Sequence, residues 1–112
     1  MQKFEYRTPR YLVDLPVLFS LPNSNIQGRC KEISKEGMKV ELQEPVSPET
    51  CGIVCIDYMD LSLELRVCVA HAGAGYDGLK FLFESERDRI GVERLVALLS
   101  GPTGQPGPVL VR

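Results

Sequence analysis

The stretch that decides the fold is EISKEGMKVEL, residues 32–42. Its second half alternates apolar with charged residues, which is the pattern of a half-buried β-strand, so Met38, Val40 and Leu42 are expected to face a core. Its first half contains a Ser-x-x-Gly turn over residues 34–37. Such a turn offers backbone amides and a flexible glycine that can form an anion-binding nest, although an ordinary tight turn is the alternative.

Segments on both sides of this stretch are rich in β-forming residues. Pro16 lacks the amide proton that a sheet ladder needs, so the first strand is expected to be bulged or to lie at an edge. Six short strands in meander order favour a small antiparallel barrel. The predicted strands are Tyr11–Phe19, Ile26–Ile33, Met38–Leu42, Gly52–Asp57, Leu61–Val69 and Leu79–Phe83.

The glycine-rich segment Gly73–Gly78 matches G-x-G-x-x-G, but a dinucleotide-binding fingerprint requires a helix directly after it. A strand is predicted to follow here, so we interpret the segment as a hairpin turn. Ser85 then fits a helix N-cap, with acidic residues in the first turn behind it. The apolar face of this helix, expected to pack on the barrel, consists of Val92, Leu95, Val96 and Leu99.

The chain therefore reads as an all-β domain with a C-terminal α-helix. Its 112 residues fit one domain large enough to bury a core. We expect an N-terminal arm at residues 1–10, the barrel and helix at residues 11–100, and a Gly- and Pro-rich tail at residues 101–112, which begins at the helix-stopping pair Gly101-Pro102.

The net charge of −2 argues against general affinity for DNA or RNA. The charges are nevertheless unevenly placed: residues 1–40 hold seven Lys and Arg against four Asp and Glu, a net +3, and the remaining residues hold six against eleven, a net −5. An anionic ligand should therefore bind near the N-terminal third. No apolar run approaches the roughly 20 residues of a membrane span, and no secretory signal opens the chain, so we expect a cytoplasmic protein without membrane insertion.

The four cysteines Cys30, Cys51, Cys55 and Cys68 are expected to be free thiols in that reducing compartment. A zinc site built from cysteines and His71 is the weaker alternative, because Cys51-x-x-x-Cys55 lies in a strand rather than a zinc knuckle. No nucleophile, base and carboxylate come together in the sequence, and no acid–base pair stands out. We therefore expect neither enzymatic activity nor a metal or other cofactor.

A more distinctive signal is Arg7-Thr8-Pro9-Arg10, which places two guanidinium groups on an extended segment directly before the first strand. Arginine forks bind phosphate bidentately and can donate to guanine O6 and N7. The alternative is that these residues only solvate a loose chain end.

Together, the arginine arm, the strand that follows it, the Ser-x-x-Gly turn and the terminal helix resemble the PilZ domain family over roughly residues 5–100. That family has a six-stranded, split β-barrel and binds cyclic di-GMP through an R-x-x-x-R arm and a [D/N]-x-S-x-x-G motif. Arg10, Ser34 and Gly37 occupy motif positions, whereas Tyr6 replaces the first arginine and Glu32 replaces Asp or Asn.

The resemblance implies a cyclic di-GMP receptor in bacterial second-messenger signalling, in which ligand binding changes the arm and a surface read by an unidentified partner protein. Its expected ligand-binding residues are Arg7, Arg10, Glu32, Ser34 and Gly37. Glu32 retains acceptor character and can bond a guanine edge or hold an arginine, while Arg7 can substitute for the missing arginine. The alternative hypothesis, favoured by the replacements at Tyr6 and Glu32, is a degenerate adaptor that acts through protein contacts without nucleotide.

Overall fold

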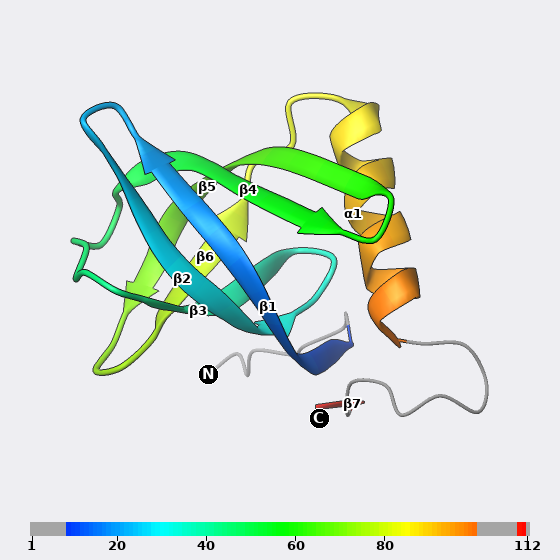
Figure 1. Ribbon diagram of the computed structural model, residues 1–112, viewed down its shortest axis with the longest axis horizontal. Coiled ribbons are helices and arrows are strands. Elements are labelled where there is room, and N and C mark those ends of the chain that lie inside the picture. The colour runs from blue at the N-terminus through cyan, green and yellow to red at the C-terminus, as the bar shows by residue number, and fades with distance from the viewer. Residues whose placement is uncertain (1–8, 101–109, 112) are drawn as a thin grey trace, which may run out of the picture.

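The alternating sequence folds into strands in which buried and more exposed residues alternate. In the third strand, for example, Met38 and Val40 are buried, whereas Lys39 and Glu41 are more exposed. The computed structural model describes residues 9–100 and 110–111 (Figure 1). Its strands are β1 Arg10–Leu21, β2 Ser24–Ile33, β3 Gly37–Leu42, β4 Cys51–Tyr58, β5 Leu61–Ala72, β6 Asp77–Phe81 and β7 Leu110–Val111, and its helix is α1 Glu86–Ser100.

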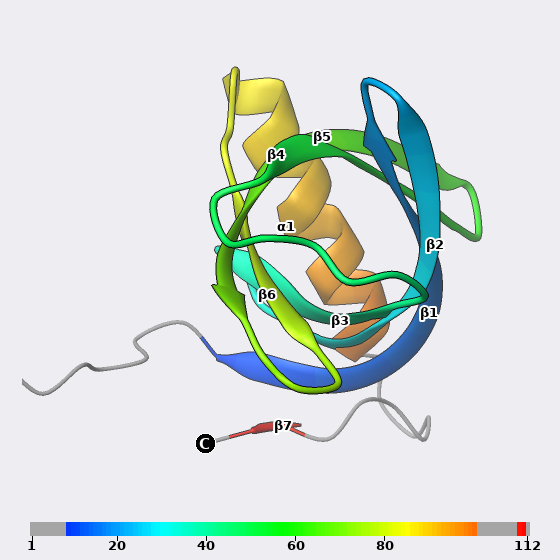
Figure 2. The same cartoon turned by 90° about the vertical axis from the view of Figure 1, so that its left-hand side faces the viewer.

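The first six strands form the predicted six-stranded antiparallel barrel, which closes through pairing of β1 with both β2 and β4. The prediction of meander order was wrong. The order around the barrel is β2-β3-β6-β5-β4-β1, so β3 pairs with β6 rather than with β4. The connection at residues 43–50 carries the chain from β3 across the end of the barrel to β4, beside β1 (Figure 2).

The prediction that β1 is bulged is confirmed, because its register against β2 shifts between Leu12 and Leu15, immediately before Pro16. The core fills the barrel with apolar side chains of all six strands, among them the fully enclosed Phe19 and Val40. Of the three residues expected to face the core from β3, Leu42 is only half-buried because it lies at the end of that strand.

Helix α1 begins where the sequence predicts, because Ser85 caps it: Asp88 N donates to Ser85 Oγ at 3.3 Å. The predicted apolar face is confirmed, since all four of its residues are buried. Gly91 on the same face lets the helix approach β5, where a Cβ atom at this position would meet the Leu63 side chain at 2.8 Å. In the view along the barrel, α1 lies across the far opening (Figure 2).

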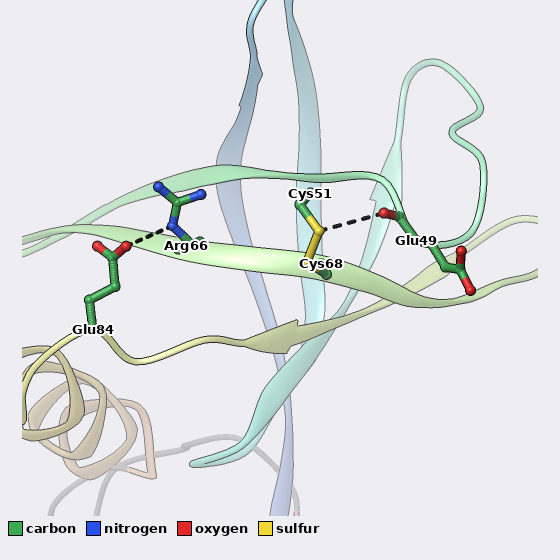
Figure 3. Close-up of a disulfide and its surroundings, with 5 residues drawn as sticks. All are labelled: Glu49, Cys51, Arg66, Cys68 and Glu84. Carbon is green, nitrogen blue, oxygen red and sulfur yellow. Dashed lines mark hydrogen bonds and ion pairs between the residues drawn. A yellow bond between two sulfur atoms is a disulfide. The ribbon is translucent and has the colours of Figure 1, made fainter.

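The expectation of four free thiols was wrong, because Cys51 and Cys68 form a disulfide between β4 and β5 (Figure 3). These residues are direct cross-strand partners with Cα atoms 4.0 Å apart, a register that sequence spacing does not disclose. Each sulfur is thus bonded to the other, which removes both from the alternative zinc site. Cys30 and Cys55 are free; burial raises the pKa of the Cys30 thiol to about 12, and partial burial also raises that of Cys55.

Within the tail predicted at residues 101–112, Leu110 and Val111 form β7, which pairs antiparallel with Tyr11 and Arg10 at the start of β1. The rest of the tail and most of the predicted arm, including Tyr6 and Arg7, lie outside the described residues. Over the part of the chain that the structure covers, no helix is long and apolar enough to cross a membrane.

Candidate functional site

The Ser-x-x-Gly turn between β2 and β3 is organised around the buried side chain of Ser34. Its Oγ accepts hydrogen bonds from the backbone amides of Glu36 at 3.0 Å and Gly37 at 3.3 Å. The Ser34 amide in turn donates to the Gly37 carbonyl at 2.9 Å. The serine therefore holds the turn closed from inside, which is a structural role independent of any ligand.

Gly37 is required by the close approach of β3 to β6. A Cβ atom at this position would lie 2.4 Å from the backbone oxygen of Leu79, closer than real Cβ contacts, and only a backbone shift would relieve the clash. The glycine of the motif thus also has a structural reason to be glycine.

Arg10 and Glu32 form an ion pair at the start of the barrel, with Arg10 Nη1 donating to Glu32 Oε1 at 3.0 Å. The Glu32 side chain is 9% exposed and that of Arg10 is 26% exposed. A register shift in β2 between Cys30 and Glu32 turns Glu32 toward the arginine. Glu32 therefore does hold an arginine, one of the two roles considered for it from the sequence.

These four residues surround one cavity of about 630 Å³, a size within the usual range for small-molecule sites. The cavity brings together Arg10 of β1, Glu32 of β2 and the turn that contains Ser34 and Gly37, four of the residues for which ligand binding was predicted. Arg7, the fifth predicted residue, lies outside the described residues, so its position stays a prediction. The remaining lining residues are Ile33, Glu36, Met38, Lys39, Ala70, His71, Tyr76, Gly78, Leu79 and Lys80.

A second group of lining residues, which we call the second wall, carries no sequence motif and was not predicted: Lys39, His71, Tyr76, Gly78 and Lys80. These residues come from β3, β5, β6 and the turn between β5 and β6, and sequence patterns do not reveal that β3 and β6 are neighbours. The one available signal was alternation, which assigns lysines 39 and 80 to outward positions of their strands.

The two sides of the cavity are connected by a continuous row of cross-strand partners. Glu32 is opposite Lys39, Lys39 is opposite Gly78, and Gly78 is opposite His71. A bulge in β5 between Val69 and His71 places the histidine at the exposed end of this row. The barrel register thus joins the predicted motif residues to the second wall.

The charges along this row are unequally satisfied. The Glu32 carboxylate is engaged by Arg10, whereas the Lys39 ammonium lies over the ring of Tyr76, 4.4 Å from its centroid. Within the described ranges, neither Lys39 nor Lys80 forms an ion pair, in contrast to Arg29 and Lys31, which both bind Asp14. Two lysine side chains of the cavity are therefore without an ion pair among the described residues, although Glu36 also lines the cavity.

Metal chemistry receives no support from the described part of the chain, in which no three His, Cys, Asp or Glu side chains are grouped to hold an ion. His71 instead lies beside Tyr76, with ring centroids 6.4 Å apart. The arrangement is that of a small closed barrel with a cavity on its surface that is lined by Arg10, Lys39 and Lys80, among others.

The family model of the PilZ domain matches residues 5–98, and the chain belongs to this family. No curated protein matches the chain. The crystal structure of the PilZ domain of CeSA from a cellulose-synthesizing bacterium is similar, with a TM-score of 0.71 and 20% identity over 81% of this chain and 97% of that one. An uncharacterized Legionella protein has a TM-score of 0.54 and 24% identity over 81% and 89% of the two chains. These likenesses show the fold.

Proposed function

We propose that this chain is a receptor module for cyclic di-GMP, without catalytic activity, whose ligand binds in the cavity beside the Ser-x-x-Gly turn. The observation that carries the proposal is the meeting of Arg10, Glu32, Ser34 and Gly37 around one cavity of suitable volume. The family is known for binding this nucleotide, and this chain keeps three of its motif positions.

Each of the four residues has a suitable role. Arg10 carries N–H groups beyond the one bonded to Glu32, and a guanidinium can donate to a phosphate or to a guanine edge. The Glu32 carboxylate can accept from guanine N–H groups while it keeps the arginine oriented. The turn formed by Ser34 and Gly37 supplies backbone in a compact arrangement close to both side chains.

In this proposal, the arm at residues 3–10 contacts the ligand, which changes a surface that a partner protein reads. Arg7 reaches the ligand from that arm and substitutes for the arginine that Tyr6 replaces. The proposed compartment is the cytoplasm.

A second candidate function, an adaptor that acts without nucleotide, is favoured by a specific observation. Ser34 and Gly37 are both used by the fold itself, and Arg10 is already paired with Glu32. Retention of these motif positions is therefore compatible with a barrel that has kept its structure and lost its ligand.

Titration calorimetry with cyclic di-GMP separates the two functions. The receptor requires binding at protein and ligand concentrations of about 100 μM, a range that corresponds to weak but regulatory affinity. Absence of heat there, with the folded state verified by circular dichroism, would exclude the receptor and leave the adaptor.

If the ligand binds, Arg10→Ala should weaken binding more than Arg7→Ala, because only Arg10 occupies a motif position and lines the cavity. A charged hydrogen bond of this kind corresponds to roughly tenfold or more in affinity. Tyr6→Arg should tighten binding by restoring the motif. Equal losses at the two arginines would reverse the ranking, and an unchanged affinity of Tyr6→Arg would show that Arg7 already compensates.

A further inference from the structure

We propose that the second wall is a binding surface of the same ligand site, on which Lys39 contacts a phosphate and the Tyr76 ring packs against a purine base. This inference rests on the proposed function and extends it to residues outside the arm and the motif. It assigns to Lys39 and Tyr76 the recognition of the two chemical groups of a nucleotide.

Lys39 lies between the two sides of the cavity, because it is paired with Glu32 on β2 and with Gly78 on β6. Its cross-strand neighbour Glu32 on β2 is bonded to Arg10, and the Lys39 ammonium lies over the ring of Tyr76 in the turn before β6. A cation held on the face of one ring is weakly bound in water, and a phosphate competes for it effectively. Lys39 is thus poised to transfer from the ring to a phosphate oxygen.

Gly78 lies between Lys39 and His71 in the cross-strand row and has no side chain. A Cβ atom there would meet only His71, at 3.6 Å from its Cβ atom, which is an ordinary contact. The fold therefore accommodates a side chain at this position, unlike at Gly37. Gly78 also lines the cavity, and we assign this side-chain-free part of the lining, called the floor below, to the contact with a flat base.

Tyr76 is exposed and lies in the turn between β5 and β6. The residue is 40% exposed although it contacts the cavity. Its turn is fixed by a hydrogen bond from the Gly73 amide to the Tyr76 carbonyl at 2.9 Å. A partly exposed ring on a fixed turn is a suitable stacking platform for a base.

The experiment measures binding of cyclic di-GMP to the full chain by titration calorimetry at two NaCl concentrations. Lys39→Gln should weaken binding about tenfold and reduce its salt sensitivity, because one charged contact is lost. Arg94→Gln is the control for loss of one surface charge, since Arg94 is exposed on α1 and does not line the cavity. Lys39→Arg should retain most of the affinity.

The aromatic contact is tested separately. Tyr76→Leu should weaken binding by about fivefold or more, the usual effect of losing a stacked base, whereas Tyr76→Phe should bind within about twofold of the wild type. Gly78→Leu should fill the floor of the cavity and abolish binding. Its thermal unfolding measures whether the barrel remains intact.

The outcomes separate this inference from the proposed function. If the wild type binds and Lys39→Gln, Tyr76→Leu and a folded Gly78→Leu bind equally well, the second wall is not part of the site while the receptor function stands. If the folded wild type does not bind, both proposals are overturned. Loss of affinity in these variants, with Arg94→Gln unchanged, supports the second wall as assigned.

Discussion

The two sides of the cavity differ in how far the fold itself uses their residues. On the motif side, Ser34 is enclosed and hydrogen-bonded to its own turn, Gly37 accommodates a neighbouring strand, and Arg10 is paired with Glu32. On the second wall, Lys39 has no ion pair among the described residues, and Gly78 leaves space that a side chain can occupy. The motif residues can thus be retained because the fold needs them, whereas the fold makes little use of Lys39 and Gly78 on the second wall.

The largest expected effect on stability is that of breaking the disulfide beside the second wall. The disulfide joins Cys68, which is opposite Lys80, to Cys51 across 17 positions of the chain. Reduction, or Cys51→Ser, should lower the free energy of unfolding by about 3 kcal/mol, because the unfolded chain is no longer cross-linked. Thermal unfolding with and without a thiol reductant measures this change.

Breaking the same disulfide should also show whether the two sides of the cavity differ in local stability. Hydrogen exchange of the reduced protein should show a greater local loss of protection at Ala70 and His71 than at the turn of Ser34, since the bond lies on β5. Cys55→Ser is the control, because Cys55 is free and its replacement leaves the disulfide intact. Equal loss of protection on both sides of the cavity would show that the disulfide does not stabilise the second wall in particular.

The next effect compares two glycines of the same cavity. Gly37→Ala should destabilise the barrel by about 2 kcal/mol, since the new methyl group forces β3 away from Leu79. Gly78→Ala should change stability by less than about 0.5 kcal/mol, because its methyl group meets only ordinary contacts. Urea unfolding measures both, and similar losses for the two variants would remove the contrast between the walls.

Ser34→Ala should destabilise the protein by about 1 kcal/mol, because the amides of Glu36 and Gly37 lose their acceptor inside the turn. Ser62→Ala is a suitable comparison, since it removes an exposed hydrogen bond of Ser62 to Asp57. Its effect should be smaller because water replaces the lost partner. A Ser34 variant no less stable than the Ser62 variant would show that the motif serine has little structural role.

The smallest stability effects are expected on the second wall. Lys39→Gln should change the free energy of unfolding by no more than about 0.5 kcal/mol, because its contact with Tyr76 lies at a partly exposed site. Urea unfolding is again the measurement. A loss above about 1 kcal/mol would mean that Lys39 supports the barrel, and the contrast between the two walls would then be broken.

The sequence predicted the strands and the helix well because burial alternates along each strand and follows the apolar face of α1. It did not predict the strand order, because alternation shows which face of a strand is buried but not which edges pair. The same limit hid the disulfide and the second wall, both of which depend on cross-strand register. The grouping of Arg10, Glu32, Ser34 and Gly37 was predictable through the family motif, whereas Lys39 and Tyr76 carry no motif.

The strand order also has a consequence for how the chain folds during synthesis. Met38 of β3 pairs with Leu79 of β6, 41 positions later. One edge of β3 therefore stays unpaired while the ribosome synthesises β4 and β5. An unpaired edge invites association with other chains. The charges of Lys39 and Glu41 on that strand oppose such association, which gives Lys39 a protective task before the barrel has closed.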